Sequence, residues 1–516
     1  MTRTIGVPFA VKTQMLMLAS LIVLGTPGSA AADAASPLNL PGPQSISAND
    51  KALGAKSNPD MTAEFGGAYT GPQSALVRRV GITVAGQSGI ADVSRDFTFT
   101  LLNSPVENAF AIPGGYVYCT RALLALMNDE AELAFVLGHE TGHIAAHHAD
   151  QRNKVTQRDV LLGTLGQAIL GGLLGNGAAG QIGGALVKSG VNRLVTGDVM
   201  HHSRTEEFEA DDLGTVFAQK AGYDPLAASQ MLTALAAQTA LDKTIAGDAR
   251  TTPRWAMSHP DPEARVARAL DRARAMGVSS GRRNGDAFLM SLNGMIYDDD
   301  PRQGVIEGQT FTYPVGRVTF TAPAGYGMSN ATDAVTVSAL GGNGGGQASF
   351  SGGAFTGTLD AYVGQVLTKL GGDKPVQVSP RHTTINGMDT ASTTLTAQDS
   401  AGNTQDVTVV AYAVAPGQTY AFTVLTPQGS GLGALAPLVS SVRRMSAAEA
   451  AAVRARVISV VSVGRRDTVT TLAARMAYTT KARERFVVLN GLPADAERLP
   501  KGRKVKLVVW GPPGRY

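Results

Sequence analysis

Apolar residues recur at helical spacing from Ala131 to Ala146, between polar stretches on either side. The positions that would face a core are Leu133, Phe135, Val136 and Leu137. Asp129 and Glu132 precede this stripe at the spacing of a capping pair, in which each acidic side chain accepts a hydrogen bond from a free amide of the first turn. The pattern therefore predicts a buried helix over Ala131 to Ala146.

A second helix is predicted to begin in the polar run Ser203 to Asp212, where Glu207 and Asp211 lie one helical turn apart and share a face. Between the two helices, Leu161 to Val187 is apolar but rich in glycine, which makes it a poor helix former. This segment suggests either a flexible flap over a cleft or two close-packed helices of small residues.

Strand-type alternation replaces the helical pattern beyond the polar stretch Ser279 to Gly285, which is typical of a linker. The predicted strands are Thr310 to Ala322, Ala334 to Ala339, Gln405 to Val414 and Thr419 to Leu425. The predicted helices are Leu359 to Leu370 and Leu432 to Val442. Together these elements predict an α+β unit over residues 286–446, and no motif within it carries chemistry.

The length of 516 residues also predicts several domains. Residues 1–30 resemble a cleaved secretory signal, with basic residues near the start, an apolar core from Met15 to Leu24 and small residues before position 31. That core is too short to span a bilayer. Residues 31–59 are then a linker. The single cysteine, Cys119, excludes an intrachain disulfide, so export brings no disulfide framework.

The first predicted helix carries His139-Glu140-Thr141-Gly142-His143. Residues four apart on a helix lie one above the other, so His139 and His143 can chelate one metal ion. Glu140 stands beside that pair, where it can accept a proton from a water activated by zinc. A chance spacing on a helix that merely packs is the competing interpretation, which the capped, apolar context disfavours.

A catalytic zinc site needs a third protein ligand besides water. Glu207 could supply it while Asp211 hydrogen-bonds a ligand histidine and fixes its tautomer. Glu209 is the competing ligand candidate. Acidic residues at a helix start can also simply complement the helix dipole. Seven of the eight histidines fall between positions 139 and 259, which concentrates the chemistry in this part of the chain.

Three motifs in this order resemble one family: Asn108 to Gly115, the zinc helix, and the Ser-Arg…Glu…Ala-Asp run that ends at Asp211. They resemble the gluzincin peptidases that include the CAAX prenyl endopeptidase, HtpX, BepA and LoiP, over a domain of residues 60–278. The resemblance implies one Zn²⁺ per chain and favours Glu207 over Glu209. The implied roles are zinc ligation by His139, His143 and Glu207, base catalysis by Glu140, support by Asp211, and substrate pairing by the strand Asn108, Ala109 and Phe110.

His259 precedes Pro260, Asp261 and the start of an arginine-rich helix. In BepA-like relatives a His-Pro after the zinc helices can approach the metal and keep the enzyme latent. An ordinary helix start, with Asp261 as cap and Pro262 at the first helical position, explains the stretch equally well. A donor to the reaction oxyanion is also needed, with His259, Arg204 and His202 as candidates. His147 and His148 follow the zinc motif and are expected to face water at a polar helix end.

Residues 455–510 resemble a LysM domain, a small β-α-α-β unit that binds glycans with N-acetyl groups. Residues 451–516 hold 14 Lys and Arg against 4 Asp and Glu, a net charge of +10, whereas the whole chain carries only +4. This local excess favours an anionic partner such as peptidoglycan or a membrane surface over nucleic acid. A solvated basic face is the alternative.

The sequence thus predicts an α+β multidomain protein: a mainly helical peptidase domain with a small edge sheet, an α+β middle domain and a β-α-α-β LysM-like domain. We expect a periplasmic zinc endopeptidase acting on protein or peptide substrates in envelope protein quality control. One alternative is an envelope-binding or chaperone-like protein with a latent zinc site. The other is a peptidoglycan hydrolase.

Overall fold

The computed structural model describes residues 38, 40–149, 202–246, 259, 262–277, 280–331, 334–340, 345–370, 376–398 and 404–514. The predicted signal peptide and the glycine-rich segment 161–187 lie outside the described residues, as do Pro260 and Asp261. Among the helices that are described, none combines the length and the hydropathy needed to cross a membrane.

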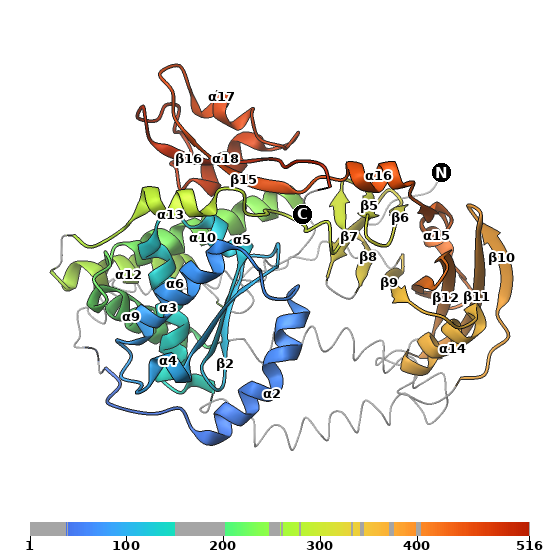
Figure 1. Cartoon of the computed structure of the whole chain (residues 1–516), viewed down its shortest axis with the longest axis horizontal. Coiled ribbons are helices and arrows are strands. Elements are labelled where there is room, and N and C mark those ends of the chain that lie inside the picture. Colours follow the sequence, from blue (N-terminus) through green and yellow to red (C-terminus); the bar gives the residue numbers. More distant parts are fainter. Residues whose placement is uncertain are drawn as a thin grey trace, which may run out of the picture.

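The N-terminal half is a helical domain around a three-stranded sheet (Figure 1). Its strands are β1 (Thr98–Leu102), β2 (Ala109–Ile112) and β3 (Tyr116–Thr120). Its helices are α2 (Ala48–Glu64), α3 (Pro72–Ala85), α4 (Val93–Asp96), α5 (Arg121–Leu126), α6 (Glu130–Ala145), α9 (Arg204–Lys220), α10 (Ala227–Ala246), α12 (Pro262–Ala275) and α13 (Gly285–Leu292). Strand β3 is central, parallel to β1 and antiparallel to β2, so β2 lies at an edge. Helix α2 begins inside the stretch expected to be a linker.

The caps of the two site-bearing helices follow from their sequences. Asp129 caps α6 by accepting a hydrogen bond from the amide of Glu132 at 3.0 Å, as the sequence predicts. Ser203 and Glu206 form a reciprocal capping box at the start of α9. Because these caps satisfy amides that a helix leaves unpaired, they determine where each helix begins.

Helices α6 and α9 approach closely because both carry glycine where they cross. A Cβ atom added to Gly214 would lie 2.6 Å from the backbone nitrogen of His139, and one added to Gly138 would lie 2.9 Å from the carbonyl oxygen of Gly214. Any side chain at these positions would push the helices apart. The close approach places the first turns of α9 beside the histidine face of α6.

The middle of the chain contains two antiparallel sheets (Figure 1). The larger has the order β10 (Arg381–Ile385), β11 (Met388–Gln398), β12 (Thr404–Ala415), β13 (Gln418–Pro427), β9 (Gln347–Ala354), β8 (Val335–Ala339) and β7 (Tyr326–Asn330). The smaller has the order β14 (Arg443–Arg444), β6 (Val318–Thr321), β5 (Thr310–Tyr313) and β4 (Val305–Glu307). Helix α14 (Leu359–Leu370) covers β11 and β12. The short elements η2 (Gly433–Leu435) and α15 (Ala436–Ser441) contribute buried residues to the hydrophobic core that the two sheets share. The predicted strands at 334–339, 405–414 and 419–425 and the predicted helix at 359–370 have counterparts here. The predicted strand Thr310 to Ala322 is instead the hairpin of β5 and β6, and the predicted helix Leu432 to Val442 is η2 followed by the short helix α15.

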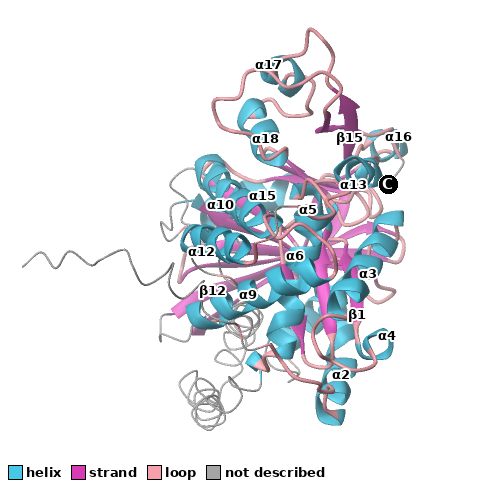
Figure 2. Cartoon of the chain, turned by 90° about the vertical axis from the view of Figure 1, so that its left-hand side faces the viewer, coloured by secondary structure: helices cyan, strands magenta, loops and turns pink. Residues whose placement is uncertain are grey.

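Helix α16 (Ala447–Ala452) leads into the C-terminal unit, which has the predicted β-α-α-β order. Its elements are β15 (Arg456–Ser462), α17 (Val469–Ala473), α18 (Ala482–Leu489) and β16 (Lys504–Trp510). Both views show this unit standing against the helical domain, with α18 beside α10 (Figures 1 and 2). Its LysM identity stays a prediction.

The C-terminal unit shares one hydrophobic core with the helical domain. Leu472, Phe486 and Leu507 belong to the same buried cluster as residues of α3, α5 and α6. The cluster also includes Phe288 of α13, although the sequence suggested residue 286 as the start of the middle domain. Backbone hydrogen bonds join the loop after α13 to β15, since the Gly294 amide donates to Ile458 and the Ile458 amide donates to Met295.

Candidate metal centre

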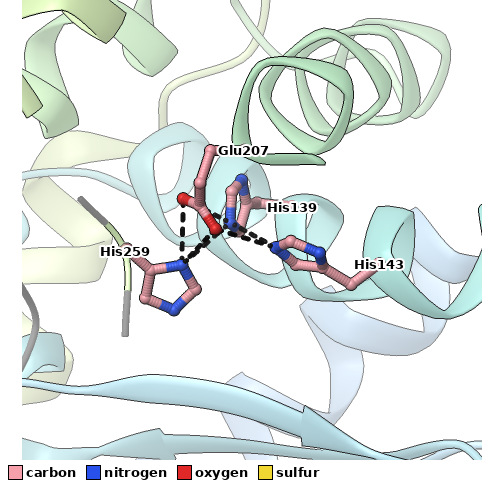
Figure 3. A group of neighbouring side chains, drawn as sticks. All are labelled: His139, His143, Glu207 and His259. Atoms are coloured by element: carbon pink, nitrogen blue, oxygen red, sulfur yellow. Dashed lines mark hydrogen bonds and ion pairs between the residues drawn. The ribbon is translucent and has the colours of Figure 1, made fainter. Parts of the chain in front are cut away.

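Two helices supply three side chains that converge on one point. His139 and His143 project from the same face of α6, with their Nε2 atoms 3.0 Å apart. Glu207 reaches them from α9, with Oε1 3.4 Å from His143 Nε2 and Oε2 3.7 Å from His139 Nε2. All three side chains are buried. They point toward one another (Figure 3). The structure thus brings together the three residues expected to bind zinc.

His259 joins this group from a segment far along the chain. Its Nδ1 atom lies 3.0 Å from Glu207 Oε1 and 3.4 Å from His139 Nε2 (Figure 3). The potential ligand atoms of all four residues lie within 4.8 Å of one another. On its other side, His259 Nε2 lies 3.3 Å from the carbonyl oxygen of Ala109 on β2 and 3.6 Å from Glu140 Oε1. His259 therefore bridges the metal-ligating group and the edge strand.

Asp211 and Arg265 support the group from behind. The Nδ1 atom of His139 lies 3.0 Å from Asp211 Oδ1, as expected for the residue that sets the tautomer of that histidine. Arg265 on α12 donates two hydrogen bonds of 2.7 Å to Asp211 and lies 2.6 Å from Glu207 Oε2. Sequence reasoning missed Arg265. Its only signal was that α12 is rich in arginine, because the contact depends on how α12 packs against α9.

The environment sets the protonation states that a metal requires. Burial lowers the pKa of His143 well below its usual value, which favours the neutral imidazole. Burial alone would raise the pKa of Glu207, but the charges of Arg265 and His259 outweigh it and hold this pKa well below the usual value. Neutral imidazoles and an ionised carboxylate are the forms that bind metal ions.

Glu140 is buried beside the group. Burial raises its pKa, although the charges of His259 and His139 oppose the shift. Neither of its carboxylate oxygens accepts a hydrogen bond from any residue that the structure describes. Two imidazoles and a carboxylate match the ligands of catalytic zinc sites, and a buried carboxylate lacking a donor suits a water molecule held between it and the ion. The residues present therefore fit Zn²⁺.

The other candidates lie around this centre. Glu209 is half exposed and lies outside the ligand group, with its Oε2 atom 3.3 Å from His148 Nε2. Arg204 is exposed at the first turn of α9. The buried ring of His202 stacks on His143, with ring centres 3.6 Å apart. Phe110 on the edge strand β2 and Asn108 just before it are buried, while the Ala109 carbonyl faces His259.

His148 departs from its expected place. His147 is exposed, as predicted, but His148 is only 1% exposed and its Nδ1 atom lies 2.8 Å from His143 Nδ1. The prediction assumed that the helix continued past the zinc motif. Helix α6 instead ends at Ala145, and His147 adopts a left-handed conformation with φ of 55°. That turn brings His148 back to the ligand face.

An apolar cleft opens next to His143. Four isoleucines contribute to its lining: Ile46, Ile90, Ile112 and Ile144. One wall is the segment around Gln44, whose side-chain amide donates to the Ala145 carbonyl at 2.9 Å and whose backbone amide donates to Gly89 at 3.0 Å. The cleft thus runs from the ligand group to the C-terminal end of β2.

A helix bearing two histidines and a glutamate, with a third ligand from a following helix, defines the class of HExxH zinc metallopeptidases. The model of peptidase family M48 matches residues 73–273, so this part of the chain is a peptidase M48 domain. The resemblance to the gluzincin family is thereby confirmed.

Curated relatives agree with this assignment. The beta-barrel assembly-enhancing protease of Yersinia pestis is 33% identical over 184 residues, which cover 36% of each chain. The protein of that name from Escherichia coli K12 is 28% identical over 237 residues, 46% of this chain and 47% of that one. Mitochondrial metalloendopeptidase OMA1 of Schizosaccharomyces pombe is 28% identical over 196 residues, 38% of this chain and 51% of that one. The chain therefore spans about a third to a half of the length of these relatives.

Among solved structures, a chain from Bacteroides thetaiotaomicron aligns with 41% of this chain and 88% of its own length. Its TM-score of 0.24 and sequence identity of 10% are too low for a conclusion about the fold.

Proposed function

We propose that this protein is a zinc-dependent endopeptidase that hydrolyses peptide bonds of protein substrates in the periplasm, as part of envelope protein quality control. One observation carries the proposal: His139, His143 and Glu207 converge beside the buried carboxylate of Glu140, which accepts no hydrogen bond from a described residue. The relatives, named as proteases, support the reaction, and the signal-like residues 1–30 support export.

Each residue has a defined task in this reaction. A bound zinc ion would polarise the scissile carbonyl and lower the pKa of a water molecule. Asp211 accepts the Nδ1 proton of His139 and so keeps its Nε2 lone pair directed at the ion, while Arg265 holds Asp211 and Glu207 ionised. Glu140 takes a proton from the attacking water on a carboxylate oxygen and then donates it to the leaving amine nitrogen.

An extended polypeptide suits the surroundings of the site. Within the described residues β2 pairs only with β3, so its other edge can add a substrate strand through backbone hydrogen bonds. The isoleucine-lined cleft beside His143 can then take an apolar side chain near the scissile bond. Unfolded proteins present both features, an extended backbone and exposed apolar residues.

His259 supports a latent resting state. Its Nδ1 atom lies among the candidate ligand atoms, so His259 could act as a further ligand, and its Nε2 atom contacts the Ala109 carbonyl that an added substrate strand would use. Substrate entry therefore requires His259 to move. The same contact favours the second candidate function, an envelope-binding or chaperone-like protein whose zinc site is latent. A peptidoglycan hydrolase has no such specific support.

The basic C-terminal unit supports a location near the cell wall or an anionic membrane surface. Its net charge of +10 over residues 451–516 favours such a partner over nucleic acid. We infer that it adds surface affinity to the peptidase while forming part of the same folded body.

Glu140→Gln tests the proposal. The amide is similar in size and can still hydrogen-bond water, but it cannot accept a proton at neutral pH. We expect normal zinc content and no cleavage of casein, whereas the wild-type protein should cleave casein and lose that activity with a chelator. Purified sacculi form the parallel substrate. Cleavage of casein by Glu140→Gln at the wild-type rate would refute the assigned base, and chelator-sensitive release of sacculus fragments would favour the hydrolase.

A further inference from the structure

His148 links the metal centre to Glu209 through two short polar contacts. Its Nδ1 atom lies 2.8 Å from His143 Nδ1, and its Nε2 atom lies 3.3 Å from Glu209 Oε2. The imidazole is buried, and the Glu209 side chain is 47% exposed. A chain of polar atoms therefore runs from the metal-ligating imidazole to a carboxylate at the surface.

The ring protons of His143 and His148 can be placed in one way that leaves His143 Nε2 able to bind a metal. His143 turns its Nε2 atom toward Glu207 and His139, so this nitrogen must carry a lone pair in order to bind a metal. A neutral imidazole then has its proton on Nδ1, which can donate only to a lone pair on His148 Nδ1. The proton of His148 therefore sits on Nε2, where it donates to Glu209. Both ring nitrogens of His148 and the Nδ1 atom of His143 then have a hydrogen-bond partner.

We propose that His148 is a positioning residue for the metal centre, and that Glu209 in turn positions His148. The inference rests on the proposed zinc site. Ligand histidines generally donate their second N–H to an acceptor that fixes ring orientation and tautomer, and loss of that acceptor typically costs about 10- to 100-fold in metal affinity. His139 has such an acceptor in Asp211, and His148 with Glu209 gives His143 the equivalent partner.

The backbone around His148 is consistent with this role. A left-handed conformation is unfavourable for a residue with a side chain and persists where surrounding contacts enforce it. At His147 those contacts come from Gln44, whose Oε1 atom lies 2.7 Å from His147 Nε2 and whose amide group donates to Ala145. The turn they hold is the one that returns His148 to the ligand face.

A second cation is the competing explanation, because nitrogen atoms of His143, His148 and His202 lie within 4.8 Å of one another. Binding there would place a cation on each nitrogen of His143 and would require loss of its last ring proton. A neutral imidazole keeps that proton, and the hydrogen bond to His148 uses it. The hydrogen-bonded arrangement is therefore favoured.

Zinc affinity provides the test. All variants would be made in a Glu140→Gln background to prevent self-cleavage, and competition with a chromogenic chelator would give the zinc dissociation constant. His148→Phe fills the same space without an acceptor and should weaken zinc binding about 10- to 100-fold. His148→Gln can accept the His143 proton through its side-chain oxygen and should recover most of that loss. His382 is an exposed residue of β10 whose ring pairs with Asp360, away from the metal centre, so His382→Phe is the control and should bind zinc normally.

Substitutions of the half-exposed Glu209 give a second set of variants in which no buried residue is changed. Glu209→Gln keeps an oxygen acceptor for His148 and should bind zinc nearly as the parent does, whereas Glu209→Leu should bind it several-fold more weakly. Thermal unfolding of the zinc-free proteins separates positioning from folding, since Glu209→Leu should melt like its parent without metal. If His148→Phe does not fold, the Glu209 pair decides the question.

Three results would overturn the inference. They are unchanged zinc affinity in His148→Phe and Glu209→Leu, an equal loss in His148→Phe and His148→Gln, or a second bound zinc that disappears in His148→Phe. Glu207→Ala keeps this failure distinct from failure of the proposed function. If Glu207→Ala loses zinc while His148→Phe binds normally, only the positioning role is wrong. If the unsubstituted protein binds no zinc, the proposed function itself fails.

Discussion

Replacing Lys506 with methionine tests whether the C-terminal unit is built into the peptidase core. Lys506 lies on β16 and is fully buried. Its Nζ atom donates to the carbonyl oxygens of Ala125, Leu126 and Met127 at 2.6, 3.2 and 2.5 Å. These carbonyls stand at the C-terminal end of α5, where a helix leaves its last acceptors without partners. Methionine keeps the length and apolar stem but has no donor.

Two opposing terms set the size of the effect. A buried acceptor that loses its donor costs about 1–3 kcal/mol, so three carbonyls give a gross loss of about 3–9 kcal/mol. Burying an ammonium group is itself unfavourable, and this cost lowers the pKa of Lys506 to about 7. Methionine removes that cost. We expect the loss of donors to the three carbonyls to outweigh the removed cost of burying the charge. Lys506→Met should therefore lower the free energy of unfolding by about 2–4 kcal/mol.

Urea unfolding at neutral pH, followed by circular dichroism, would measure this change. Lys504→Met is the matched control, because Lys504 lies on the same strand, is partly exposed, and has only a 3.7 Å ion pair with the exposed Asp286. Its loss should change stability by about 0.5 kcal/mol or less. A Lys506→Met protein as stable as the wild type, or more stable, would refute the reasoning.

Further predictions concern the metal centre, the core and the middle domain. Glu207→Ala should lose most of its zinc by metal analysis, whereas Glu209→Ala should lose only several-fold in affinity; the reverse order would make Glu209 the ligand. His259→Ala should raise basal casein cleavage with zinc retained, because it opens the fourth position and the Ala109 carbonyl; a roughly hundredfold loss of turnover would instead assign His259 to the oxyanion. Deleting residues from 451 onward should give an insoluble or strongly destabilised protein, and a soluble, fully active product would show that the unit is separable. Burial raises the pKa of Asp299 to about 6, so its folded form keeps a proton that the unfolded chain has lost and its contribution to stability falls as the pH rises from about 4 to 6. Asp299→Asn should therefore raise the melting temperature above pH 6 and leave it unchanged near pH 4.

Local sequence patterns were sufficient for the elements that carry the reaction. Asp129 and Glu132 predicted the start of α6, and the polar run from Ser203 to Asp212 predicted that a helix begins there, as α9 does at Arg204. Helix α14 has the bounds that its apolar spacing suggested. These predictions succeeded because caps and periodicity act within one or two turns, so neighbouring residues contain the whole signal.

The sequence by itself therefore determined the helices α6, α9 and α14, the apolar residues that α6 buries, and that His139, Glu140 and His143 share one helix. Only the tertiary structure decided what those side chains meet. Arg265 supports the centre because α12 packs across α9, His148 because a single left-handed residue reverses the chain, and Lys506 because β16 packs against the end of α5. Such contacts join residues far apart in the chain, and they depend on how whole elements pack rather than on any spacing along the sequence.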